Sequence, residues 1–150
     1  MMKVGDVCSR LVIDVTQDED VRRAAELMRK YHVGYLVVTE YGDADKVPIG
    51  VITDRDIVIE VVAKAVDADE LTVGDIMTEL PLVTSEGDGI SDALDAMHSK
   101  GVRRVPVVDA KRSLIGVLAI DDLLPVLATG ISTMASIVGS QRRQESDVRG

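Results

Sequence analysis

The chain builds the same junction twice. Residues 49 to 62 read IGVITDRDIVIEVV and residues 115 to 128 read IGVLAIDDLLPVLA, so an apolar, strand-like run twice ends in polar residues and restarts as a second apolar segment. Upstream, VGDVCS at 4 to 9 matches VGDIMT at 73 to 78. Similarity at an interval of 66 to 69 residues indicates an internal structural repeat. Any fold for this chain must therefore accommodate two copies of one unit.

Each copy shows the same order of predicted elements. A short apolar segment precedes a helical pattern, VRRAAELMRKYHV in the first copy and ISDALDAMHSKGV in the second, because apolar residues recur there every three or four positions. Two β-branched runs of strand length then predict a hairpin, and a helix over 54–65 or 121–128 closes the unit. The predicted unit is strand, helix, strand, strand, helix.

Neither copy is large enough to bury a good core alone, since a unit of about 65 residues is marginal by itself. We therefore predict an α/β (α+β) fold in which two β-α-β-β-α repeats pack sheet to sheet with pseudo-two-fold symmetry. Repeat 1 covers 1–66, repeat 2 covers 67–130, and a C-terminal segment covers 131–150. That segment has apolar residues at helical spacing and then turns polar, which predicts a short helix with a frayed end.

Composition narrows the classes of function. Asp and Glu outnumber Lys and Arg by 26 to 17, and this excess repels polyanions and argues against nucleic-acid binding. Cys8, His32 and His98 give no set with metal-ligand spacing, so we expect no metal. The chain begins without the apolar core of a signal peptide, and no uninterrupted apolar run approaches the roughly 20 residues of a membrane span. With its single cysteine, we expect a protein of the reducing cytoplasm without a membrane partner.

The first junction carries the pattern Thr53-x-x-Asp56, which has two interpretations. It resembles a capping box at the start of a helix. Alternatively, Asp56 accepts hydrogen bonds from ribose hydroxyls while the Thr53 hydroxyl and the helix amides hold a phosphate, with Arg55 adding positive charge. At the second junction Ala119 replaces the threonine while Asp122 remains. A capping role alone does not predict that the hydroxyl is lost while the acid is kept, although Asp122 could simply cap or solvate its helix.

The segment GVRRVPVV places two arginines directly in a predicted strand. Because side chains alternate along a strand, Arg103 and Arg104 should point to opposite faces, and at least one should face an interior groove. One interpretation is a charged edge strand marked by Pro106. The other is a phosphate clamp in an otherwise acidic protein.

Taken in order, these motifs resemble the CBS domain, and the two copies resemble a tandem CBS pair, also called a Bateman module. The resemblance covers residues 1 to about 128 and rests on VGDVCS and VGDIMT, HVGYLVV and GVRRVPVVD, and IGVITDRDIV and IGVLAIDDLL. It implies two clefts between the packed sheets, adenine nucleotides or related adenosyl ligands bound there in many members, and a disc-like homodimer. It also implies the cleft residues: Asp56 and Asp122 at ribose, Thr53 at phosphate, Ile13, Asp14, Val83 and Thr84 beside adenine, and Tyr35, Arg104 and Pro106 on the walls.

Two departures from the family pattern affect the second half. Ala119 lacks the hydroxyl group, and LVTSEGDGI is one residue shorter than the usual pattern. We therefore expect the cleft of Thr53 and Asp56 to bind more tightly, with Arg103 or Arg104 reaching across from the other repeat.

The leading hypothesis is a non-catalytic regulatory module that binds AMP, ADP, ATP or a dinucleotide such as NAD and signals through the geometry of a homodimer or a protein partner. The apolar face over 131–138 would extend that dimer or merely cover the protein's own core. The rival hypothesis is a docking scaffold with degenerate pockets. A phosphoryl-transfer enzyme using the paired aspartates ranks last, because no Walker-type glycine loop accompanies them. No catalytic residue is expected, since nothing identifies a base that would activate Cys8.

Overall fold

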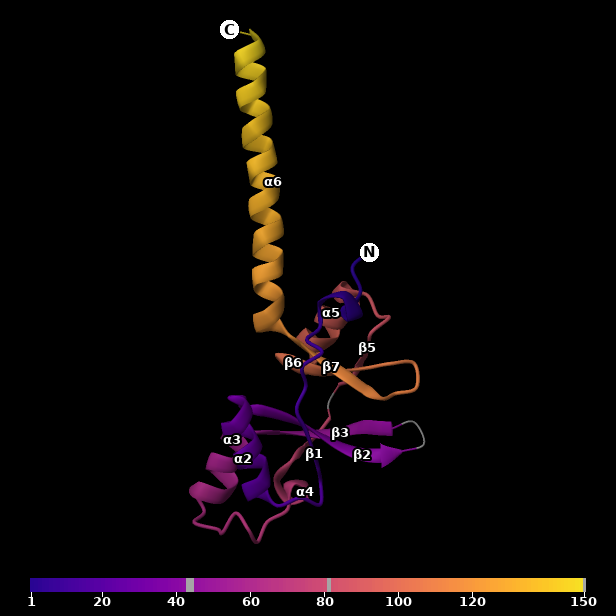
Figure 1. Cartoon of the computed structure of the whole chain (residues 1–150), viewed down its shortest axis with the longest axis vertical. Coiled ribbons are helices and arrows are strands. Elements are labelled where there is room, and N and C mark those ends of the chain that lie inside the picture. The colour runs from indigo at the N-terminus through magenta and orange to yellow at the C-terminus, as the bar shows by residue number, and fades with distance from the viewer. Residues whose placement is uncertain (43–44, 81, 150) are drawn as a thin grey trace.

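The structure is a computed structural model that describes residues 1–42, 45–80 and 82–149 (Figure 1). Its elements confirm the predicted mixed α/β fold of two repeats. In chain order they are α1 (Val4–Val7), β1 (Asp14–Thr16), α2 (Val21–Tyr31), β2 (Tyr35–Gly42), β3 (Asp45–Thr53), α3 (Asp54–Ile57), the π-helix η1 (Val58–Val62), α4 (Val73–Ile76), β4 (Thr78–Glu79), β5 (Thr84–Ser85), α5 (Ile90–Lys100), β6 (Arg104–Val108), β7 (Leu114–Ala119) and α6 (Ile120–Arg149).

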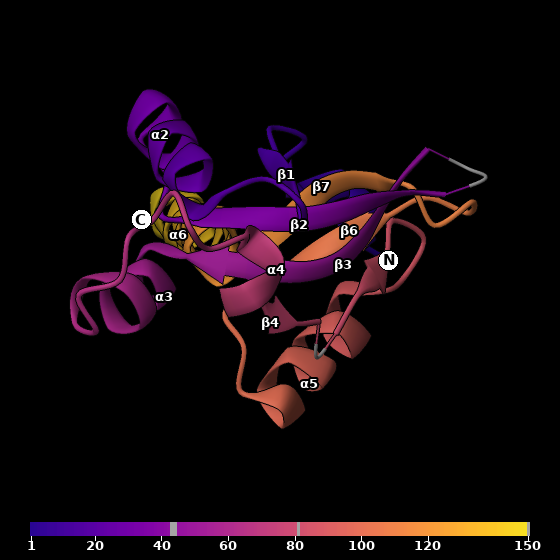
Figure 2. The same cartoon turned by 90° about the horizontal axis from the view of Figure 1, so that it is seen from below.

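The strands form two sheets, one for each hairpin. The four-stranded sheet has the order β1-β2-β3-β4 and the three-stranded sheet has the order β5-β6-β7. In both, the first strand runs parallel to the second and the hairpin is antiparallel. Figure 2 shows β2 and β3 lying over β6 and β7, which is the predicted sheet-to-sheet packing. Because β6 lies between β5 and β7, the edge-strand interpretation of Pro106 is wrong.

The leading segment of each repeat packs into the core of the other repeat. Val4 of α1 is fully buried in a cluster with Val105 and Leu118 of the second sheet, whereas Val73 of α4 is buried with Leu36 and other residues of the first. The backbone follows the same exchange, since Gly5 donates to Glu86 and Gly74 donates to Gln17. The division of the sequence near residue 66 is therefore not a division of the packing. Each core needs residues from both repeats.

The C-terminal segment differs from the prediction of separate helices and a frayed end. A single helix, α6, runs through Ile120–Arg149, because residues 141–149 are rich in Gln, Arg and Glu, which are good helix formers. Only Leu123 is buried among its thirty described residues. Figure 1 shows α6 projecting alone from the body.

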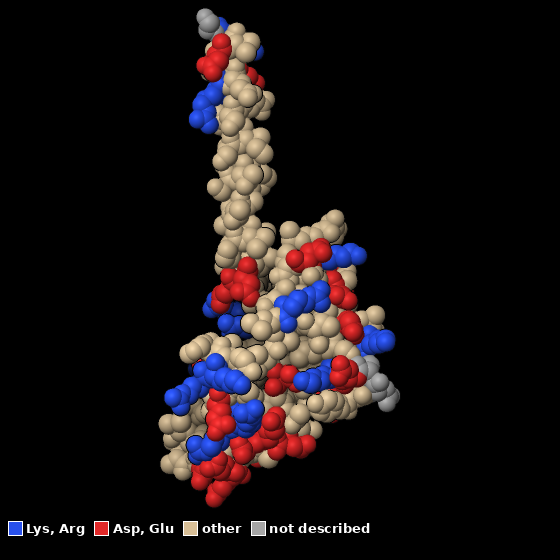
Figure 3. All heavy atoms as spheres, viewed as in Figure 1, with Lys and Arg blue, Asp and Glu red and all other residues tan. Residues whose placement is uncertain are grey.

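No charged residue occurs between Asp122 and Arg142, and Figure 3 shows this uncharged length between the charged body and the charged tip of α6. Within the described chain, α6 is the one helix long and apolar enough to cross a membrane by length and composition alone. The sequence has no uninterrupted apolar run of that length, but α6 reaches the mean hydropathy of a membrane span although Thr, Ser and Gly interrupt it.

Candidate functional site

Two clefts lie between the sheets, and each combines the junction of one repeat with strand-flanking residues of the other. The larger, which we call the Thr53 cleft, has a volume of about 590 Å³, and its described lining consists of Tyr35, Val51, Thr53, Arg55, Leu80, Leu82, Gly101, Val102, Arg103, Arg104 and Pro106. The smaller, the Asp122 cleft, has a volume of about 300 Å³ and is lined by Ser9, Leu11, Val12, Ile13, Tyr31, His32, Val33, Gly34, Tyr35, Arg104, Val117, Ala119 and Asp122.

The apolar walls of the clefts are related by the repeat. Residues 69 positions apart in the sequence line equivalent walls of the two clefts. Leu11 and Ile13 line the Asp122 cleft, and the corresponding Leu80 and Leu82 line the Thr53 cleft. Val33, which follows α2, and Val102, which follows α5, are related by the same interval and line one cleft each. The clefts are therefore two copies of one concave site of the size that small-molecule ligands occupy.

Thr53 and Asp56 form the capping box that their spacing predicts. The Thr53 amide donates to Asp56 Oδ2 at 2.9 Å, the Thr53 hydroxyl donates to the same oxygen at 3.1 Å, and the Asp56 amide donates to Thr53 Oγ1 at 3.2 Å. One carboxylate oxygen of Asp56 is thus directed toward the helix start. The capping interpretation is confirmed, and it orients the Thr53 side chain at the mouth of the cleft.

A close backbone approach fixes the position of that helix start. The Asp54 amide donates to the Gly34 carbonyl at 3.0 Å. A Cβ at Gly34 would lie only 2.6 Å from Asp54 Oδ2, so a side chain there would displace the Asp54 carboxylate. The first junction is thereby held against the strand that begins with Tyr35.

Positive charge gathers in the Thr53 cleft. Of its described lining residues three are arginines, Arg55, Arg103 and Arg104, and none is Asp or Glu. Arg103 Nη2 lies 2.7 Å from Asp121 Oδ1 and Arg104 Nη2 lies 3.8 Å from Asp121 Oδ2. These pairs are at least 46 % exposed at each side chain, so they are weak and an anion can compete for the guanidinium groups. In a protein of net charge −9, this cleft is a local site for anions.

Tyr35 and Arg104 occupy equivalent positions of the two repeats and line both clefts. The Arg104 guanidinium carbon lies 5.7 Å from the centroid of the Tyr35 ring, within the range of a cation–π contact. Within the part of the chain that the structure describes, the Tyr35 hydroxyl is buried and has no hydrogen-bond partner. Burial raises the pKa of this hydroxyl, and nearby Arg104 partly opposes that shift. The hydroxyl is a neutral group that can donate to a bound molecule.

The Asp122 cleft has a different polar composition. Ala119 replaces the threonine at the junction, Asp122 supplies an exposed carboxylate, and Arg104 is its one arginine among the described lining residues. His32 ends α2 in the left-handed conformation, with φ of 54°. This cleft combines one acid, one guanidinium group, an imidazole and a phenol, which suits a ligand of lower negative charge.

The structure places eight of the twelve predicted site residues on a cleft wall: Ile13, Tyr35, Thr53, Arg55, Arg103, Arg104, Pro106 and Asp122. It does not bring the other four, Asp14, Asp56, Val83 and Thr84, into the described lining. Asp14 instead accepts from Lys46 Nζ at 3.1 Å and from Thr39 Oγ1 at 3.0 Å. Thr84 is buried and donates to Asp88.

Sequence reasoning missed Leu82, the residue beside the position assigned to Val83. The repeat interval provides the signal, because Ile13 plus 69 residues gives Leu82. The helices α2 and α5 begin at Val21 and Ile90, at the same interval. The second repeat therefore has no deletion relative to the first between its cleft residue and its helix.

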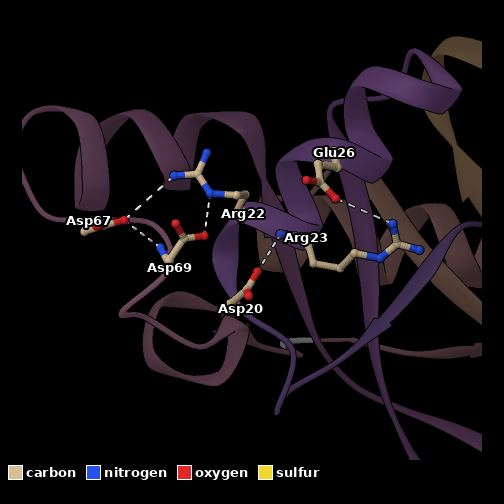
Figure 4. A network of polar contacts seen from close by, with 6 residues as sticks. All are labelled: Asp20, Arg22, Arg23, Glu26, Asp67 and Asp69. Carbon is tan, nitrogen blue, oxygen red and sulfur yellow. Dashed lines mark hydrogen bonds and ion pairs between the residues drawn. The ribbon is translucent and has the colours of Figure 1, made fainter.

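Some charged residues away from the clefts make structural contacts. Figure 4 shows Arg22 of α2 paired with Asp67 and Asp69, and the Asp20 side chain accepting from the Arg23 amide at 2.7 Å. These contacts tie α2 to the segment before α4. Across residues 1–42, 45–80 and 82–149, no group of three His, Cys, Asp or Glu side chains is placed to hold a metal ion.

Comparison with known proteins identifies the repeat. The family profile of the CBS domain matches residues 4–63 and again residues 73–129. The chain belongs to the CBS-domain family. The tandem CBS pair predicted from the repeated motifs is thereby confirmed, and the match stops within the first third of α6.

Curated relatives include other CBS proteins. The chain is 38% identical over 126 residues to an uncharacterised protein of Methanopyrus kandleri, where the match spans 83% of this chain and 62% of that one. It is 31% identical over 123 residues to the CBS domain-containing protein YhcV of Bacillus subtilis, spanning 82% and 84%. A segment of inosine-5'-monophosphate dehydrogenase from Methanocaldococcus jannaschii is 32% identical over 122 residues, or 23% of that enzyme and 81% of this chain.

Solved structures share the fold. The CBS chain resembles Hypoxic Response Protein I, described with two coordinated zinc ions, with a TM-score of 0.70 and 29% identity over 83% of this chain and 98% of that one. It also resembles the CBS domain pair of protein MJ0100 in complex with 5'-methylthioadenosine and S-adenosyl-L-methionine, with a TM-score of 0.71 and 22% identity over 86% and 98%. The latter likeness supports the architecture.

Proposed function

We propose that this protein is a non-catalytic regulatory module that binds an adenine nucleotide, with the Thr53 cleft as its principal site. The observation that carries the proposal is the convergence of Arg55, Arg103 and Arg104 on a cleft without carboxylates in its described lining, in a protein of net charge −9. Guanidinium groups bind phosphate through paired hydrogen bonds. The Thr53 hydroxyl adds a further partner for the phosphate. The Asp56 carboxylate, which is hydrogen-bonded to Thr53 and lies outside the described lining, is the proposed acceptor for ribose hydroxyls.

The apolar walls support a nucleoside as the remaining part of the ligand. Leu82, Val102 and Pro106 give the Thr53 cleft a flat, uncharged side on which a purine can lie. The relationship to MJ0100, whose CBS pair is described with two adenosyl compounds, supports the same ligand class. AMP, ADP, ATP and NAD all combine an adenine with phosphate and fit this arrangement.

The Asp122 cleft is proposed as a second, weaker site. Its Asp122 carboxylate matches the ribose partner of the first cleft, but Ala119 provides no hydroxyl for a phosphate. Arg104 is shared by both clefts, so a ligand that draws it into one changes the charge of the other. A ligand without phosphate groups, such as an adenosyl thioether, suits the smaller site.

We further propose that the module acts in the cytoplasm as a homodimer and transmits ligand binding to a protein partner. An equivalent segment forms 23% of the M. jannaschii inosine-5'-monophosphate dehydrogenase, so CBS pairs of this type accompany an enzyme in at least one relative. A ligand shifts such an assembly only through its different affinities for two geometries. The shared Arg104 and Tyr35 provide one physical route between the clefts.

The decisive experiment is calorimetric titration of the full chain with AMP, ADP, ATP, NAD and S-adenosylmethionine, compared with Asp56→Ala and Asp75→Ala. Asp75 is the matched control because it caps α4 through an equivalent capping box with Thr72, at 2.8 Å, and lines neither cleft. We expect micromolar binding of at least one phosphate-bearing ligand, its loss in Asp56→Ala and its retention in Asp75→Ala. Equal loss in both variants would mean that capping, and not contact with the ligand, explains the effect.

A docking scaffold with inactive clefts is the second candidate, and Ala119 is the observation in its favour. It predicts no binding of these ligands even at millimolar concentration in folded protein freed of carried-over nucleotide. That result would replace the regulatory proposal with the scaffold.

A further inference from the structure

The fold leaves an apolar side of α6 uncovered. Its exposed residues include Leu124, Leu127, Ile131, Met134 and Val138, whose side chains are 42 to 63% exposed. The CBS match ends at residue 129, so most of this surface belongs to the chain's own extension. In Figure 1 and Figure 3 the helix stands clear of the body, so none of the other described residues covers this surface.

We propose that α6 pairs with α6 of a second copy of this chain, in antiparallel orientation. The five residues named above follow one another at intervals of three, four, three and four. This alternation is the heptad spacing that keeps one seam of a helix facing a partner helix over several turns. The proposal does not rest on nucleotide binding.

The ends of the uncharged segment have opposite charge, and this sets the orientation. Asp121 and Arg142 are 21 residues apart, or three heptads, so both lie on the same flank of the seam. Antiparallel pairing that sets Leu127 beside Val138 of the partner subunit brings Asp121 opposite Arg142 of the partner subunit. Parallel pairing would instead place acid beside acid at one end and arginine beside arginine at the other.

Small side chains on the same flank allow the helices to approach closely. Ala128 and Ala135 lie between Asp121 and Arg142 in the sequence. The antiparallel register places Ala128 opposite Ala135 of the partner subunit. The helix spans about 45 Å, since each residue adds about 1.5 Å. The two bodies then lie at opposite ends of the pair and do not obstruct it.

The opposite face of α6 carries Thr129, Ser132, Thr133 and Ser136, and three of the hydroxyls in this segment bond to the backbone carbonyl four residues earlier. Hydroxyl groups paired within the helix are compatible with water and with lipid. The heptad spacing of the seam and the opposite charges at its two ends are the features of helix pairing. The second copy is therefore the occupant that the pattern favours.

The first test is the mass of the full chain in solution by sedimentation equilibrium, compared with Ile131→Asp and Ser132→Asp. Both variants add one charge to the exposed helix, but Ile131 lies on the seam and Ser132 on the polar face. We expect the wild-type protein and Ser132→Asp to share one assembly and Ile131→Asp to fall to half its mass. A monomeric wild-type chain, or equal behaviour of the two variants, would overturn the proposal.

Disulfide cross-linking tests the orientation in a Cys8→Ser background. Leu127→Cys mixed with Val138→Cys should form a mixed dimer, because the antiparallel register makes these positions neighbours. Each variant alone should not cross-link, since its two copies of the residue lie about 16 Å apart along the pair, beyond the reach of a disulfide. Cross-linking of each variant with itself would indicate parallel pairing and overturn the proposed orientation.

Charge reversal provides a third test with a matched control. Arg142→Asp should weaken the dimer about threefold or more at low salt, because it faces Asp121 of the partner, whereas Arg143→Asp makes the same charge change away from the seam. Equal effects would show that the register is wrong. Flotation of the chain with phosphatidylcholine and phosphatidylglycerol vesicles, together with a monomeric state without them, would assign the surface to a membrane instead.

Discussion

The Thr53 cleft and the Asp122 cleft draw on matching positions of the two repeats, yet they differ in the residues that bear charge. Their walls pair Leu80 with Leu11 and Leu82 with Ile13, so the apolar shape is preserved. The differences lie at the junctions, where Thr53 matches Ala119, and at the centre, where Arg104 matches Tyr35. Duplication thus reproduced the shape of the site, and a few substitutions gave the two copies different chemistry.

The centre shows why the copies cannot be treated as independent sites. Arg104 and Tyr35 stack on each other and each reaches both clefts. A symmetric protein would have two identical residues there, and two arginines would repel each other. A guanidinium group over a phenol ring is instead a favourable pair. The same substitution that makes the two clefts different therefore also stabilises the contact between the repeats.

The largest expected effect comes from removing the shared positive charge. Arg104→Ala should weaken the binding of a phosphate-bearing adenine nucleotide by about tenfold or more, because hydrogen bonds to charged groups contribute about 1.5–3 kcal/mol. Calorimetry measures the change. Arg29→Ala is the control, since Arg29 is exposed on α2, lines neither cleft and changes the net charge equally. If the two variants bind alike, Arg104 is not part of the site.

Thr53→Ala should make the first junction resemble the second. Loss of the N-cap hydroxyl lowers the free energy of unfolding by about 1 kcal/mol, and urea denaturation measures it. The same variant should also weaken nucleotide binding, because the phosphate loses a hydrogen-bond partner. Asp20→Ala, which removes the side chain that accepts from the Arg23 amide at the N-cap of α2, should show the loss of stability without the loss of binding. Binding equal to wild type in Thr53→Ala would leave the hydroxyl with a capping role alone.

Much of the fold and part of the candidate site could be predicted from the sequence alone. The repeat, the order of elements and the tandem CBS pair followed from periodic motifs, and the capping box at Thr53 followed from local spacing. The exchange of α1 and α4 between the cores did not, because it depends on long-range packing that no local pattern encodes. The resemblance assigned Val83 to the cleft, whereas the described lining includes the preceding residue, Leu82, a difference of one position.

The continuous α6 was missed for a different reason. Its sequence changes from apolar to polar at residue 141, which was interpreted as the end of a helix. Helix formation depends on backbone propensity as well as on apolar periodicity, and the polar residues after 141 retain that propensity. The composition changed at that point while the secondary structure continued.

A smaller effect is expected at the other member of the central pair. Tyr35→Phe removes a buried hydroxyl that has no partner within the described residues, so the free energy of unfolding of the free protein should rise by about 1 kcal/mol. Thermal or urea denaturation of the ligand-free protein measures it. In the presence of nucleotide the gain should shrink if the hydroxyl donates to the ligand. A destabilised Tyr35→Phe protein would show that the hydroxyl already has a partner in solution.

The smallest effect is expected from Ala119→Ser, which makes the second junction resemble the first. Ala119→Ser creates a Ser-x-x-Asp pattern with Asp122 at the start of α6, equivalent to Thr53-x-x-Asp56. We expect a gain of about 0.5 kcal/mol in the free energy of unfolding, because a hydroxyl replaces a methyl group at an N-cap. Binding of AMP in the second cleft should become detectable by calorimetry at a lower concentration. A loss of stability would mean that the buried site at Ala119 cannot accept the added oxygen.

The exchange of leading segments between the two cores sets an order of events during synthesis of the chain. Val4 leaves the ribosome 114 residues before Leu118, its partner in the second core. At about 5–20 residues per second, roughly 6 to 23 s pass before that partner exists. The first core closes sooner, once Val73 has emerged. During this interval the α1 segment has no second core to pack against, and it is enclosed only when the other half of the chain has been made.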